Sequence, residues 1–137
     1  MRWIAVIAVI ALAGCGASKN ESLPAPCANG PGIVVKALAK APAAVTLDGT
    51  PISHCFNIGA SGADVQIVGT NLIAAAQELA AQHRALQLGY LVGAARRGAK
   101  RNGLGDEIVR RLEAEATVAA AQRTAYDRGL RAGAASG

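Results

Sequence analysis

The fold class is decided by residues 61–90, which read SGADVQIVGTNLIAAAQELAAQHRALQLGY. Mostly apolar residues recur there every three or four positions: Val65, Val68, Leu72, Ala76, Leu79, His83, Leu86 and Tyr90. This spacing predicts an amphipathic α-helix, with a break near His83 as an alternative. The opposite face is polar (Gln66, Thr70, Gln77 and Arg84), which argues against a membrane span. Ser61 and Asp64 have the spacing of a helix cap.

Toward the C-terminus, helical character is interrupted and then resumes. Glycines 98, 103 and 105 predict a turn over residues 100–105. Asp106 and Glu107 then open a last helix, whose exposed side carries Glu107, Arg111 and Glu115 and whose inner side carries Ile108, Leu112, Ala116 and Ala119. Tyr126 and Leu130 extend the packed face, and residues 131–137 are expected to fray. Gly89 and Gly93, four residues apart, would let a neighbouring helix pack closely.

Toward the N-terminus, residues 31–52 predict a helix and a hairpin. Pro31 suits the first turn of a helix through Leu38 that Pro42 stops, although residues 33–35 are also compatible with a strand. Asp48-Gly49 lies between Val45-Thr46-Leu47 and Thr50-Pro51-Ile52, which is typical of a tight hairpin because this dipeptide readily adopts positive backbone angles.

The first residues have the order of a secretory leader. Met1 and Arg2 give a positive start, and residues 3–13 are apolar but fall short of the roughly 20 that a spanning helix needs. The run ends in Leu12-Ala13-Gly14-Cys15, which resembles the lipobox of bacterial lipoproteins. The resemblance covers only this leader and implies cleavage before Cys15 and a diacylglyceryl group on its sulfur. An ordinary secretory leader or a buried N-terminal strand are the alternatives.

These observations predict one signal peptide, one tether and one domain: residues 1–14, 15–26 and 27–137. Cys27 and Cys55 are the cysteines left after Cys15 is acylated, and export favours a disulfide between them. The alternative is a metal site of these two cysteines with His54 and His83, which lacks paired short spacing. We therefore expect a mainly α fold, a small helical bundle whose disulfide-closed N-terminal segment can contain a β-hairpin.

Residue patterns typical of catalysis are missing from the sequence. Ser53 and His54 are adjacent, which on a strand turns them to opposite faces, and His83 lies on the apolar stripe as a packed or helix-end residue. The acids are explained by turn, cap and surface roles. No nucleophile turn and no phosphate-binding glycine loop is found in the sequence, so we expect no enzyme activity, no metal and no cofactor.

The formal charge of +5 belongs to the second half of the chain. Arg96, Arg97, Lys100 and Arg101 could form a basic edge for anionic lipids or acidic envelope polymers, although a solvated surface is the simpler explanation. Nucleic acid is not expected, because aromatic residues make up 3% of the chain.

The leading hypothesis is a non-enzymatic lipoprotein, held by its N-terminal lipid at a membrane of the bacterial cell envelope, facing outside the cytoplasm and contacting another envelope component. The alternatives are an anionic-surface binding module that uses the basic edge and, as a poorer fit, a small metal protein or hydrolase.

Overall fold

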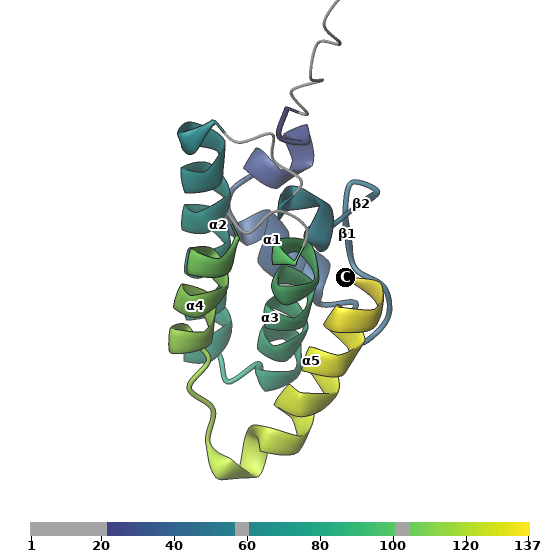
Figure 1. The fold of residues 1–137 in the computed structure, drawn as a ribbon. Coiled ribbons are helices and arrows are strands. Elements are labelled where there is room, and N and C mark those ends of the chain that lie inside the picture. The colour runs from purple at the N-terminus through teal and green to yellow at the C-terminus, as the bar shows by residue number, and fades with distance from the viewer. Residues whose placement is uncertain (1–21, 57–60, 101–104) are drawn as a thin grey trace, which may run out of the picture.

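The structure is a computed structural model that describes residues 22–56, 61–100 and 105–137 (Figure 1). The predicted leader, Cys15, most of the tether and Arg101 lie outside these residues. The described chain is a mainly helical bundle with a small two-stranded sheet, as predicted. Its elements are η1 (Ala25–Ala28), α1 (Pro31–Leu38), β1 (Thr46–Leu47), β2 (Thr50–Pro51), η2 (Ile52–Phe56), α2 (Gly62–Ala81), α3 (Ala85–Ala99), α4 (Asp106–Glu115), η3 (Ala120–Gln122) and α5 (Arg123–Ser136).

Helix α3 is the centre of the core. It lies between the α2 and α4 pair and α5 (Figure 1), and Leu88, Tyr90, Leu91 and Val92 are fully buried in it. Most of the core is aliphatic, as a chain with few aromatic residues requires. Within the described residues, no helix combines the length and the hydropathy needed to cross a membrane.

The stripe of residues 61–90 forms two helices rather than one. The Ser61 side chain caps α2 by accepting a hydrogen bond from the backbone N–H of Asp64 at 3.1 Å, which confirms the predicted cap. The helix ends after Ala81, and His83 has a left-handed φ of 55°. The alternative with a break near His83 is therefore the correct one.

Glycines allow α3 and α5 to approach each other closely. A Cβ added at Gly89 or Gly93 would lie within 3.0 Å of the backbone of α5, and one at Gly129 or Gly133 would meet the backbone of α3 in the same way. The close packing predicted for Gly89 and Gly93 is thus confirmed. The frayed end predicted for residues 131–137 is wrong, because α5 continues to Ser136 and is held by this contact.

The N-terminal segment also follows the sequence predictions. Helix α1 begins at Pro31, so the strand alternative for residues 33–35 is wrong, and Asp48 and Gly49 have the positive φ values, 45° and 84°, of the predicted turn. The disulfide Cys27–Cys55 is present, with Cα atoms 5.5 Å apart. The disulfide joins η1 to η2, and both cysteines are buried.

One hydroxyl connects three parts of the fold. The buried Tyr90 of α3 accepts a hydrogen bond from the backbone N–H of Val45 at 2.9 Å, and its oxygen lies 3.2 Å from Oγ of Ser136 in α5. The start of the hairpin and the end of the last helix therefore meet at α3.

Helix α4 is shorter than predicted. Ile108 and Leu112 are buried, as expected, but the helix ends at Glu115, and Ala119 is exposed rather than packed. The chain turns there toward η3 and α5, so the inner face expected for one long helix stops after Ala116.

Candidate functional site between α2 and α4

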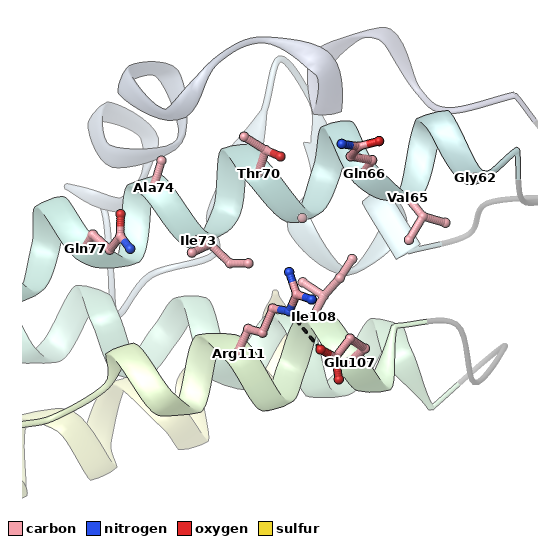
Figure 2. Close-up of a pocket in the computed structure, with 11 residues that line it drawn as sticks. Gly62, Val65, Gln66, Thr70, Ile73, Ala74, Gln77, Glu107, Ile108 and Arg111 are labelled. Atoms are coloured by element: carbon pink, nitrogen blue, oxygen red, sulfur yellow. Dashed lines mark hydrogen bonds and ion pairs between the residues drawn. The ribbon is translucent and has the colours of Figure 1, made fainter.

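A groove of about 580 Å³ lies between α2 and the first half of α4 (Figure 2). One face of α2 lines the groove with residues three or four positions apart, and one turn of α4 lines the other side. The residues from α2 are Gly62, Val65, Gln66, Gly69, Thr70, Ile73, Ala74 and Gln77, and those from α4 are Glu107, Ile108 and Arg111. The volume is in the range of sites that hold small ligands or part of a peptide.

The interior of the groove is apolar. Val65 and Ile73 project from α2 toward α4, and Ile108 lies opposite them (Figure 2). Ile108 is buried in the core, whereas Val65 and Ile73 are only partly covered. Burial of this exposed aliphatic surface would favour the binding of an apolar partner.

Charged side chains border the groove on the α4 side. Glu107 accepts hydrogen bonds from Nε of Arg111 at 2.8 Å and from Nε and one Nη of Arg110 at 2.8 and 2.7 Å. These two guanidinium groups lower the pKa of Glu107 from 4.5 to about 2. Arg111 lines the groove and Arg110 does not, although both bind the same carboxylate.

Arg111 has donors left for a ligand. Its Nε bonds to Glu107, and no other described residue hydrogen-bonds to its two Nη groups. The side chain extends from α4 toward α2 (Figure 2) and is 61% exposed. A carboxylate entering the groove could therefore form a charge-assisted hydrogen bond with Arg111.

Gly69, in the middle of α2, is not required by the packing of the bundle. A Cβ at this position would lie 3.4 Å from Cγ1 and 3.5 Å from Cδ1 of Ile108, which is ordinary van der Waals contact. Glycine inside a helix nevertheless destabilises it by roughly 0.5–1 kcal/mol relative to alanine. Gly69 is buried at the wall of the groove, so a larger side chain at this position would have to extend past Ile108 into it.

The predicted basic edge is largely occupied by contacts within the protein. Nε of Arg96 lies 2.7 Å from a carboxylate oxygen of Glu113, and Arg97 donates to the backbone oxygens of Ala134 and Ala135 at the end of α5. Lys100 is exposed, and Arg101 lies outside the described residues. The four residues therefore have different environments, which their spacing in the sequence could not reveal.

The described histidines and cysteines do not come together as a site. Cys27 and Cys55 are bonded to each other, His54 lies in η2, and His83 is exposed between α2 and α3. Among residues 22–56, 61–100 and 105–137, no three His, Cys, Asp or Glu residues are close enough to hold a metal ion. Since both thiols form the disulfide, they are not free to act as the ligands of the metal-site alternative.

Sequence reasoning missed the groove because it depends on how α4 lies against α2. The signal it could have used is Gly69, a helix-interior glycine on the partly apolar face of α2. Comparison with protein-family models, with curated proteins and with solved structures found no match for this chain.

Proposed function

We propose that this chain is a lipid-anchored protein of the bacterial cell envelope whose helical domain binds a segment of another envelope protein in the α2–α4 groove, without catalysing a reaction. The observation that carries the binding role is the open apolar groove at Gly69. The lipobox-like residues at Cys15 support the anchor. The Cys27–Cys55 disulfide is compatible with an oxidising compartment.

The dimensions of the groove favour a helical segment as its occupant. The lining residues of α2 run from Gly62 to Gln77, which corresponds to about 22 Å at 1.5 Å per residue. An amphipathic helix of about four turns would present its apolar stripe to Val65, Ile73 and Ile108. The missing side chain at Gly69 would let the backbone of that helix approach α2.

Arg111 adds a polar requirement to this apolar contact. Because its Nη groups face the groove, the preferred partner helix carries an aspartate or glutamate beside its apolar stripe. The hydrogen bond from its Nε to Glu107 keeps the guanidinium in place.

The groove is tested by site-specific photo-crosslinking in intact cells. A photoreactive residue at Gln66 or Gln77 should give one defined crosslinked protein, and one at the exposed Arg128 of α5 should not. Gly69→Met, which fills the groove, should abolish the crosslink. The matched control is Gly32→Met, because Gly32 lies on α1 with no atom within 4 Å of an added Cβ. Equal crosslinking from Gln66 and Arg128, or no effect of Gly69→Met, would contradict the proposal.

The arginines provide a second matched pair. Arg111→Gln should weaken crosslinking from Gln66 about tenfold, because a charge-assisted hydrogen bond contributes on the order of 1.5 kcal/mol. Arg110→Gln removes the same charge, and also hydrogen bonds to Glu107, but outside the groove, and should leave crosslinking unchanged. Equal losses would show that overall charge, rather than a contact in the groove, is responsible.

A further inference from the structure

A second hollow, separate from the α2–α4 groove, lies between α1 and the hairpin. It measures about 370 Å³ and is lined by Ile33, Lys36, Ala37, Lys40, Thr46, Leu47, Asp48 and Gly49. Ile33 is 45% exposed, one of two large hydrophobic side chains exposed among the described residues. Lys36 and Lys40 are exposed beside it. An aliphatic side chain and two ammonium groups therefore share one face.

These lysines differ from the arginines of the predicted basic edge. Neither Lys36 nor Lys40 forms an ion pair with another described residue, whereas Arg96 is paired with Glu113. The acid that borders the hollow is Asp48, at the tip of the hairpin. The face thus keeps a net positive charge that is available to an external anion.

We propose that this face, defined by Ile33, Lys36 and Lys40, lies on the anionic surface of the bilayer that holds the lipid anchor. The inference rests on the proposed anchor at Cys15. Ser22 is seven positions after Cys15, and an extended chain over seven positions spans at most about 25 Å. The first α-helix after the tether is α1, in the half of the bundle where the described chain begins (Figure 1).

The chemistry of the face fits a lipid surface better than a soluble anion. Ile33 can enter the boundary between headgroups and acyl chains while the lysine stems extend their ammonium groups to lipid phosphates. Each nearby cation contributes up to about fivefold in affinity at an anionic surface. The tether keeps the face at high effective concentration, so even weak binding would orient the domain.

The test uses the mature chain with Cys15→Ser, so that association does not depend on acylation. It is mixed with vesicles of phosphatidylcholine and phosphatidylglycerol, or of phosphatidylcholine alone, and sedimented. We expect binding only to the anionic vesicles, weakening with added salt. Lys36→Gln with Lys40→Gln should lower binding at least tenfold, and Ile33→Ser should lower it as well. Asp48→Asn, which suits the same turn, should raise it.

The matched control removes two exposed arginines from α5 by Arg128→Gln and Arg131→Gln. If this control lowers binding as much as the lysine variant, the surface charge acts without a defined face and the inference is wrong. Displacement by inorganic phosphate at constant ionic strength would identify a soluble-anion site instead and would also overturn it. Acylation of Cys15, measured separately by intact mass, reports on the anchor alone, so the two failures are distinguishable.

Discussion

Single glycines have two opposite roles in this bundle. Gly133 of α5 lies against the backbone oxygen of Tyr90, where any Cβ would collide, whereas Gly69 of α2 has room for one. Gly133→Ala should lower the free energy of unfolding by about 1–3 kcal/mol, because backbone cannot move aside as a side chain can. Gly69→Ala should raise it by about 0.5–1 kcal/mol. Urea unfolding of both variants checks this; a Gly133→Ala protein as stable as the parent would refute the close packing.

The titration of Glu107 is a second expectation at the level of one residue. Its pKa in the folded protein is lowered to about 2 by Arg110 and Arg111, below the usual value of about 4.3 for glutamate. Because its pKa is lowered, ionised Glu107 stabilises the fold at pH values above the pKa of glutamate in the unfolded chain. This contribution is lost as the pH falls from about 4.5 to 2. Carbon-detected NMR should give a midpoint near 2 for Glu107. It should return to about 4.3 in the Arg110→Gln, Arg111→Gln double variant.

Among the structural elements, the disulfide-closed segment allows the clearest prediction. Cys27 and Cys55 are 28 positions apart and join η1 to η2. Replacing both by alanine should lower the free energy of unfolding by about 3.5 kcal/mol, because the unfolded chain gains loop entropy. Thermal unfolding with and without reductant measures the effect. Alkylation of unreduced protein should leave both residues unlabelled, and labelling of either thiol would exclude the bridge.

Elements with local signals were predictable, and those that depend on distant contacts were not. Pro31, Ser61 and Asp48-Gly49 act within a few residues, so α1, the start of α2 and the hairpin turn followed from the sequence. Helix α5 was missed because Gly129 and Gly133 have low helix propensity, and their stabilising partner is α3, some 40 residues away.

The candidate site was less predictable than the fold, for the same reason. Gln66, Thr70 and Gln77, which line the groove, were assigned to the polar side of an amphipathic helix, and a polar side can be either a groove wall or a solvated surface. A groove wall differs from a solvated surface only in what lies across from it. Here Ile108 lies across from Gly69, and Arg111 lines the same groove. The ion pair of Arg96 with Glu113 was equally invisible, because it joins different helices.

At the scale of the whole molecule, the proposed anchor would determine where the chain resides. Cys15→Ala should then release the protein from membranes into the soluble fraction, since two or three acyl chains hold a protein stably whereas the proposed face on α1 would bind weakly. Intact-mass analysis of the parent should show a chain beginning at Cys15 with added lipid. A natural product that retains Met1, or lacks lipid, would contradict the proposed anchor.

The meeting of Val45, Tyr90 and Ser136 has a consequence for the biogenesis of the protein. Until α5 emerges from the ribosome, the face of α3 that carries Gly89 and Gly93 lacks its packing partner. The Tyr90 hydroxyl likewise lacks its contact with Ser136. Native packing of α3 therefore waits until α5 has been made. This delay would suit the proposed export, because a chain that is not yet packed can pass through a narrow channel before it folds.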